Sequence, residues 1–197
     1  MAFPSIVLAS TSRYRRELLE RLRLPFDVQA PDIDEMALPL ESPRETALRL
    51  AREKAVAVAA RFPGTVVIGS DQTVDADGVS FVKPMTHDRA LAQLQLLQGR
   101  SAVFYTAVAV VGPASNNVQE DCVQTTVRFK RIATERLENY LRADQPYDCA
   151  GSAKIESLGI ALMDSVESSD PTALIGLPLI RLTSMLAVAG VDVLAQR

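Results

Sequence analysis

The sequence predicts an α/β protein in which a mixed, twisted β-sheet is flanked by helices. Two short apolar runs, 6–9 and 65–69, each lie beside a stretch whose apolar residues recur at helical spacing. Two longer stretches, 102–111 and 118–132, alternate between apolar and polar residues and indicate a hairpin of long strands. No repeat, low-complexity tract or long linker interrupts this order, so we expect one domain over residues 1–197.

The N-terminal segment is predicted to form a strand, a polar turn and a helix. The apolar run 6–9 ends in the hydroxyl residues 10–12, after which leucines recur at helical spacing up to Pro25. A second strand is expected at 26–30, and a polar, acidic loop follows at 31–39. The first strand and helix therefore meet at a sharp elbow.

Capping and turn residues predict the remaining elements. Ser42-Pro43-Arg44-Glu45 is a capping-box pattern with proline at the first helical position. The elements expected from there on are a helix from 43 to about 62, a strand at 65–69 with Ser70-Asp71-Gln72 at its end, a hairpin turn at 75–78, a helix at 86–98, a turn of the long hairpin at 113–117, a helix at 134–143, a loop-rich segment at 151–171 and a helix at 179–189.

Composition excludes several classes of protein. With 197 residues, of which 48% are hydrophobic, the chain buries enough surface to fold without a disulfide or a metal, so we expect Cys122 and Cys149 to be free thiols. A net charge of −3 offers no basic field for nucleic acid. The first residues have neither a signal peptide's basic start nor a membrane-spanning run, so we expect a cytoplasmic protein.

Three arginines lie at the end of a helix that disfavours them. Arg13, Arg15 and Arg16 fall in the first predicted turn, where the helix dipole is positive and each cation costs about 0.3–1 kcal/mol. A bound polyphosphate would reverse this cost, because backbone N–H groups, hydroxyls and guanidinium groups would all contact its oxygens. The alternative is that the arginines are solvated, with Arg16 paired to Glu20.

A carboxylate and two lysines support the interpretation as an anion site. Asp71 follows an apolar strand, where a carboxylate can bind Mg²⁺ or orient water, and Glu35 in the acidic loop is a second candidate ligand. Lys54 lies on the long helix and Lys83 beside a proline. The alternatives are an Asx turn or a helix cap for Asp71, a solvated loop position for Glu35 and a solvated surface position for each lysine.

Several motifs, taken together and in order, resemble those of the Maf family of nucleotide pyrophosphatases. They are Leu8-Ala9-Ser10-Thr11-Ser12-Arg13-Tyr14-Arg15-Arg16-Glu17-Leu18-Leu19, Asp34-Glu35, Glu53-Lys54-Ala55, Ile68-Gly69-Ser70-Asp71-Gln72, Lys83-Pro84, Ala150-Gly151 and Gly176-Leu177-Pro178. The resemblance implies an elongated, twisted mixed sheet, two lobes with a deep cleft and often a homodimer. It also implies hydrolysis of nucleoside triphosphates to monophosphate and diphosphate with a divalent cation, Mg²⁺ or Mn²⁺.

The resemblance also implies roles for individual residues. Asp71 is the expected proton acceptor, and the other polar site residues are expected to be Ser10, Arg15, Glu35, Lys54 and Lys83. The mechanism that we expect from these residues adds Asp71, with Glu35, as the ligands of the metal. Arg13 stands where the family usually has proline.

Three positions separate branches of this family. The dTTP- and UTP-hydrolysing branch carries arginine, threonine and glutamine at the positions of Tyr14, Gln72 and Glu156, whereas the 7-methyl-GTP branch has an aromatic residue, glutamine and glutamate. This chain resembles the 7-methyl-GTP branch. The choice suits the chemistry, because N7-methylated guanine is cationic and favours an aromatic face and a carboxylate.

Alternatives remain for the base-recognition residues and for the activity. Tyr14 also fits the apolar stripe of its helix, and Glu156 also fits a solvated loop position. Ser157 and Ala153 depart from the residues usual in this branch, and Lys154 is a further candidate contact. The competing functions are hydrolysis of dTTP or UTP, and regulation of septum formation by a nucleotide-binding protein without fast turnover.

Overall fold

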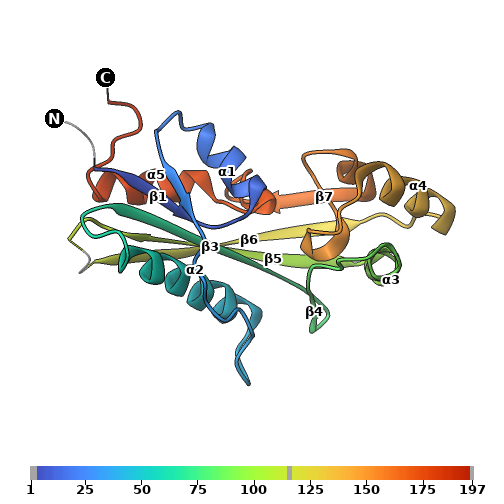
Figure 1. The fold of residues 1–197 in the computed structure, drawn as a ribbon. Helices are drawn as coiled ribbons and strands as arrows, with labels where there is room; N and C mark the ends of the chain where they lie inside the picture. The colour runs from blue at the N-terminus through green and yellow to red at the C-terminus, as the bar shows by residue number, and fades with distance from the viewer. Residues whose placement is uncertain (1–3, 115–116, 196–197) are drawn as a thin grey trace. The chain divides into compact units, whose positions relative to one another are not determined.

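The computed structural model describes residues 4–114 and 117–195 and has five α-helices and seven strands within them (Figure 1). The helices are α1 (Arg13–Glu20), α2 (Pro43–Ala59), α3 (His87–Leu97), α4 (Thr134–Asp144) and α5 (Leu179–Val188). The strands are β1 (Ile6–Ala9), β2 (Asp27–Gln29), β3 (Val66–Ala76), β4 (Val79–Phe81), β5 (Ser101–Val111), β6 (Val118–Phe129) and β7 (Met163–Ser168). Three short 3-10 helices are η1 (Ala150–Ser152), η2 (Leu158–Leu162) and η3 (Ala173–Ile175).

The strands form a mixed sheet in the order β2-β1-β3-β5-β6-β7, with β4 paired to β3. Strand β1 runs parallel to both β2 and β3, whereas β3 pairs with β4, and β6 with β7, in antiparallel fashion. Parallel pairs need crossover connections, and here α1 connects β1 to β2 while α2 lies between β2 and β3. The predicted mixed α/β sheet flanked by helices is confirmed.

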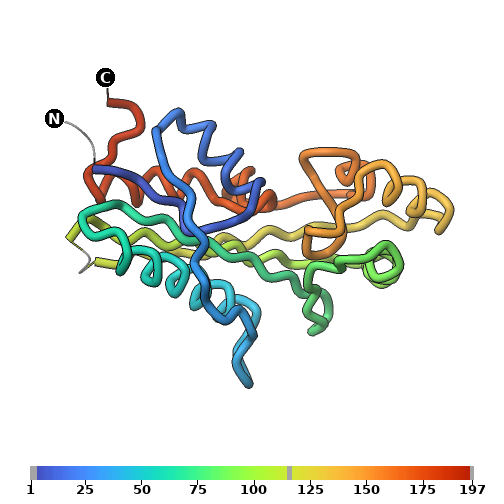
Figure 2. Tube along the Cα trace, viewed as in Figure 1, coloured from blue at the N-terminus to red at the C-terminus, as the bar shows by residue number. Residues whose placement is uncertain are grey.

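The chain divides into two compact units. The first unit comprises residues 1–72, 106–123 and 170–197, and the second comprises residues 73–105 and 124–169. Strands β3, β5 and β6 contribute residues to both units. The backbone trace shows that the first unit combines both ends of the chain, with the N-terminal elements in blue and α5 in red (Figure 2). The single domain over 1–197 and the deep cleft remain predictions.

Helices cover both faces of the strands in the first unit. Helices α1 and α5 lie on one face and α2 lies on the other (Figure 1). The core beneath α1 and α5 is a cluster of buried residues that includes Ile6, Leu8, Leu18, Leu19, Val66, Ile68, Leu182 and Leu186. Successive side chains of β1 and β3 point to opposite faces of the sheet. Because helices cover both faces, all of β1 and most of β3 are buried.

Gly69 lets α2 pack directly against β3. A Cβ atom at Gly69 would lie 2.2 Å from the carbonyl oxygen of Ala51 and 2.7 Å from the backbone nitrogen of Ala55. No side chain fits such a gap, so a glycine is required for the helix to approach this closely. The contact places Lys54, on the same turn of α2, beside the strand residues that follow Gly69.

Three predictions about the strands were wrong. Strand β3 continues to Ala76, so Asp71 lies within the strand and not at its end, because Gly69 marks a close helix contact and does not terminate the strand. The segment 151–171 contains β7, whose residues after Met163 are exposed and so give no alternating pattern. Strand β6 also ends at Phe129, three residues before the expected boundary.

Several local predictions were confirmed. The capping box at Ser42 is formed in full, and the turn at 75–78 joins β3 to β4. Both cysteines are free thiols. The expected turn at 113–117 includes residues 115 and 116, which lie outside the described residues. Within the part of the chain that the structure describes, no helix is both long and apolar enough to cross a membrane.

Candidate functional site

A buried lysine joins two carboxylates in the first unit. The Lys54 ammonium lies 2.6 Å from Oδ1 of Asp71 and 3.0 Å from Oε1 of Glu35. The side chains of Lys54 and Asp71 are only 4% and 10% exposed, whereas that of Glu35 is 57% exposed. Burial of Lys54 therefore depends on its partners, because an unpaired buried ammonium is costly. The structure brings together three of the residues that the sequence predicts for the site.

Arg15 contributes a second cation to this unit. Its Nε donates to the carbonyl oxygen of Gly176 at 3.0 Å, and its Nη1 lies 3.5 Å from Oγ of Ser10. Burial lowers the pKa of the guanidinium from its usual value, while the charges of Asp71 and Glu35 raise it. Arginine stays protonated through such shifts. The positive charges of Lys54 and Arg15 thus offset the negative charges of Asp71 and Glu35 in the absence of a ligand.

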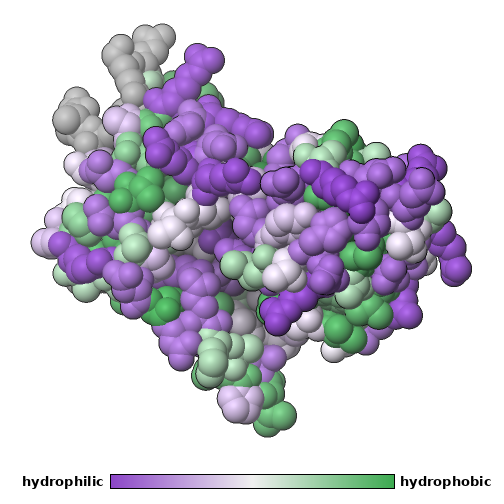
Figure 3. Space-filling view, turned by 45° about the vertical axis from the view of Figure 1, so that its right-hand side comes forward, coloured by the Kyte–Doolittle hydropathy of each residue, from purple (hydrophilic) through white to green (hydrophobic). Residues whose placement is uncertain are grey.

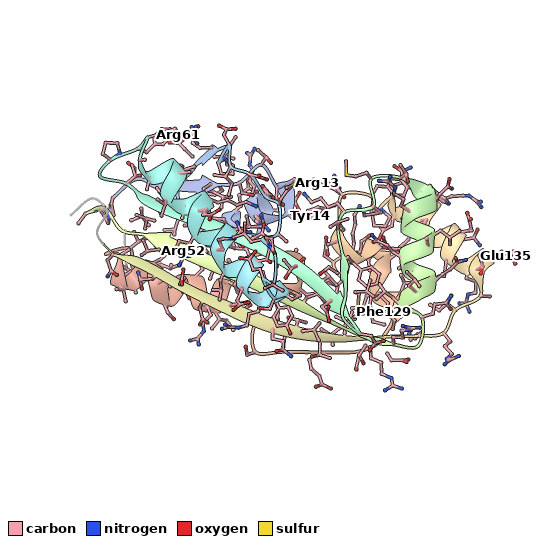
Figure 4. All side chains as sticks on the ribbon, turned by 90° about the horizontal axis from the view of Figure 1, so that it is seen from below. Arg13, Tyr14, Arg52, Arg61, Phe129 and Glu135 are labelled. Atoms are coloured by element: carbon pink, nitrogen blue, oxygen red, sulfur yellow. The ribbon has the colours of Figure 1, made fainter. Side chains whose placement is uncertain are left out.

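The three arginines of α1 point to three different partners. Arg15 turns toward Ser10 and Gly176, and Arg16 forms the expected ion pair with Glu20 at 3.0 Å. The Arg13 guanidinium lies 4.7 Å from the centre of the Tyr14 ring and donates to its hydroxyl, at the start of the helix (Figure 4). The Arg13 guanidinium therefore packs against the Tyr14 ring, and the role of Tyr14 as a base contact stays a prediction. Arg15 is the arginine of this cluster that contacts the predicted phosphate-site residue Ser10.

Gln72 makes contacts that the sequence did not predict. Its side-chain nitrogen lies 2.8 Å from Oγ1 of Thr106 and within hydrogen-bond distance of the carbonyl oxygens of Ala173 and Leu174. Thr106 also donates to Ala173, at 2.9 Å. The one visible signal was Thr106, a polar residue inside the apolar stretch of β5. In this structure Gln72 holds η3 against the strands through its amide nitrogen.

The carbonyl oxygen of Gly176 accepts hydrogen bonds from two side chains, those of Arg15 and Ser70. It accepts from Arg15, and the hydroxyl of Ser70 lies 3.0 Å away from it. Gly176 has φ +128°, a conformation that residues with a Cβ rarely adopt. Its place in the sequence pattern Gly176-Leu177-Pro178 predicted no role, because a backbone carbonyl leaves no signature in the side chains.

The other predicted site residues belong to the second unit. Lys83 is exposed between β4 and α3, and Glu156 is exposed between η1 and η2. Lys154, a candidate phosphate or base contact, directs its ammonium to the carbonyl oxygens of Asp144 and Gln145 at the end of α4. These bonds cap the C-terminus of α4, and the role of Lys154 as a phosphate or base contact stays a prediction.

Residues near Glu156 are fixed by short-range contacts. The hydroxyl of Ser157 donates to Oδ1 of Asp144, and Ala153 is half-buried. A Cβ at Gly159 would lie 2.4 Å from the Lys154 carbonyl oxygen, so the chain folds back tightly on either side of Glu156. The Ser157 hydroxyl thus ties this segment to Asp144, the last residue of α4.

The carboxylates of the first unit suit a hard cation that arrives with a phosphate. Mg²⁺ is commonly held by one or two carboxylates together with substrate phosphate oxygens. Asp71 and Glu35 share one ammonium at 2.6 and 3.0 Å, so they supply such a pair. Among residues 4–114 and 117–195, no three His, Cys, Asp or Glu side chains gather to hold a metal by themselves. The donor set thus fits a metal bound jointly with substrate.

Comparison with known proteins identifies the family. The sequence profile of Maf-like proteins matches residues 5–189. A 7-methyl-GTP pyrophosphatase of Albidiferax ferrireducens is 55% identical over 189 residues, covering 96% of this chain and 95% of that protein. One of Methylobacillus flagellatus is 52% identical and covers 97% and 100%. A HAM1 protein structure from Coxiella burnetii matches 66% of this chain and 74% of its own, with 18% identity and a TM-score of 0.45. The chain belongs to the Maf family.

Proposed function

We propose that this protein hydrolyses 7-methyl-GTP to 7-methyl-GMP and diphosphate. The observation that carries the proposal is near-full-length identity of 52–57% to proteins named 7-methyl-GTP pyrophosphatase. The arrangement of Lys54, Asp71, Glu35 and Arg15 supports it, since two cations and two carboxylates suit phosphoryl chemistry. The reaction would remove a modified nucleotide in the cytoplasm. A homodimer stays a prediction.

In the proposed mechanism, Asp71 accepts a proton from the water that attacks the α-phosphorus, and diphosphate leaves. An incoming phosphate competes with both carboxylates for the Lys54 ammonium, which lies 2.6 Å from Asp71. The carboxylate oxygen released from that ion pair becomes available to water. Arg15 and Lys83 neutralise charge on the transferred and departing groups. Bound Mg²⁺ or Mn²⁺, held by Asp71 and Glu35, would supply further charge neutralisation on the phosphate oxygens.

The reaction and its substrate are tested by measuring diphosphate release from 7-methyl-GTP, GTP, dTTP and UTP, with and without Mg²⁺ or Mn²⁺. We expect metal-dependent release that is fastest with 7-methyl-GTP. Faster release from dTTP or UTP would instead assign the other branch of the family. Release from none of them, together with tight nucleotide binding, would favour a regulator of septum formation.

Replacing Glu156 by glutamine is expected to reduce the preference for the methylated base. A carboxylate attracts the cationic 7-methylguanine more than neutral guanine, so kcat/KM should fall about tenfold for 7-methyl-GTP and change little for GTP. The measurement is the ratio of the two kcat/KM values in each protein. Glu167→Gln, at an exposed position on β7, serves as the control. An equal loss with both substrates would contradict a role for Glu156 in base recognition.

A further inference from the structure

The segment that follows Glu35 is poorly anchored by packing. It has no helix or strand between 36 and 41, and the side chains of Met36, Leu38 and Leu40 are 73%, 54% and 105% exposed. Figure 3 shows apolar surface at the bottom of the view, where this loop of the first unit lies. Leu40 also adopts φ +66°, a strained value for a residue with a Cβ. Burial of apolar surface therefore does little to hold Glu35 near Lys54.

A charged pair supplies the missing anchor. The Glu41 carboxylate accepts from Nε of Arg49 at 2.7 Å and from its Nη2 at 2.8 Å. The two side chains are only 10% and 13% exposed, so this fork is screened little by solvent. Glu41 also accepts from the Leu38 N–H and the Thr46 hydroxyl, both at 3.0 Å. We call this Arg49–Glu41 arrangement the loop clamp.

The loop clamp reaches the residue directly after Glu35. Nη2 of Arg49 donates to the carbonyl oxygen of Met36 at 2.9 Å. Arg49 and Lys54 both lie on α2, which therefore binds the segment at Glu35, at Met36 and at Glu41. The Arg49–Glu41 ion pair persists at low pH, because hydrogen bonds from Arg49 lower the pKa of Glu41 to about 2. Its contribution to stability is present above the ordinary carboxyl pKa and is lost only as the pH falls toward 2.

We propose that the loop clamp positions Glu35 against Lys54 and is needed for full activity, although neither Arg49 nor Glu41 touches the substrate. The inference rests on the proposed function, because it assigns Glu35 to the metal and phosphate site. It makes Arg49 and Glu41 positioning residues. Their effect on turnover should therefore pass through Glu35.

A double-mutant cycle tests this dependence. We expect Glu41→Gln to lower kcat/KM about tenfold in the unaltered protein and to have little further effect in a Glu35→Gln background, because interacting sites are not additive. Arg49→Lys, which keeps the charge and loses the fork, should give an intermediate loss. Arg100→Met, which removes an exposed ion pair with Asp77, is the control and should leave kcat/KM unchanged. The same loss from Glu41→Gln in both backgrounds would overturn the proposal.

Hydrogen exchange adds a readout that does not need turnover. Glu41→Gln should speed exchange of the Leu38 amide, which donates to Glu41, while the Tm falls only slightly. Unchanged exchange and unchanged kcat/KM in this variant would also overturn the proposal. The same double-mutant cycle is then measured by binding: the affinity of each variant is determined for a non-hydrolysable α,β-methylene nucleoside triphosphate. If the unaltered protein binds this analogue but hydrolyses nothing, the proposed function fails while the loop clamp is still judged by binding.

Discussion

Replacing Asp71 by asparagine is expected to lower kcat for diphosphate release about 10²–10⁴-fold, the usual contribution of a general base. The substitution keeps the shape of the side chain in the interior of β3 and removes its capacity to accept a proton. Lys54 keeps Glu35 as a partner at 3.0 Å, so the free energy of unfolding should fall by only about 1–2 kcal/mol. Steady-state kinetics and thermal unfolding measure the two effects.

Asp75 provides the matched control for this variant. It lies four residues further along β3 and its Oδ1 accepts from the Gly78 N–H in the hairpin turn, a bond that asparagine can also make. Asp75→Asn should retain near-normal kcat. If Asp71→Asn also turned over at a near-normal rate with unchanged metal affinity, the assignment of Asp71 as the proton acceptor would be wrong.

Replacing Lys54 by methionine is expected to affect both stability and activity. The variant leaves the Asp71 carboxylate, only 10% exposed, without its buried cationic partner, which should cost about 3 kcal/mol of unfolding free energy. Loss of a phosphate-neutralising cation should also reduce kcat/KM by about 10²–10³-fold. Chemical denaturation and diphosphate release provide the two measurements. Lys130→Met, at an exposed lysine on the second unit, is the control.

Combining Lys54→Met with Asp71→Asn separates the two effects. The double variant has no unpaired buried charge at this position, so it should recover about half of the stability lost in Lys54→Met. Its activity should remain at the level of Asp71→Asn or lower. If the double variant were no more stable than Lys54→Met alone, the cost would lie in packing around Lys54 and not in the ion pair.

Local sequence patterns predicted much of the fold. The capping box at Ser42 and the turn at 75–78 depend on residues within three or four positions of one another, and both form as expected. The extension of β3 beyond Gly69 could not be predicted in this way. Gly69 looks like a terminator in the sequence, and only the approach of α2 reveals why glycine is there.

The sequence predicted the charged side chains of the candidate site but not the backbone contacts that hold them. Charged side chains such as Asp71 and Lys54 stand out in a sequence, and the structure brings these two together at 2.6 Å. Contacts made by backbone carbonyls do not stand out, so the role of Gly176 in holding Arg15 was missed. Arg49 was equally inconspicuous, because one more arginine on a charged helix face carries no signal of its fork with Glu41.

In the proposed reaction, water attacks the α-phosphorus of 7-methyl-GTP. Hydrolysis in ¹⁸O-labelled water, followed by mass spectrometry of the products, tests this most directly. We expect one ¹⁸O atom in 7-methyl-GMP and none in the released diphosphate. Label in diphosphate, or release of inorganic phosphate with 7-methyl-GDP, would show attack at another phosphorus and contradict the account.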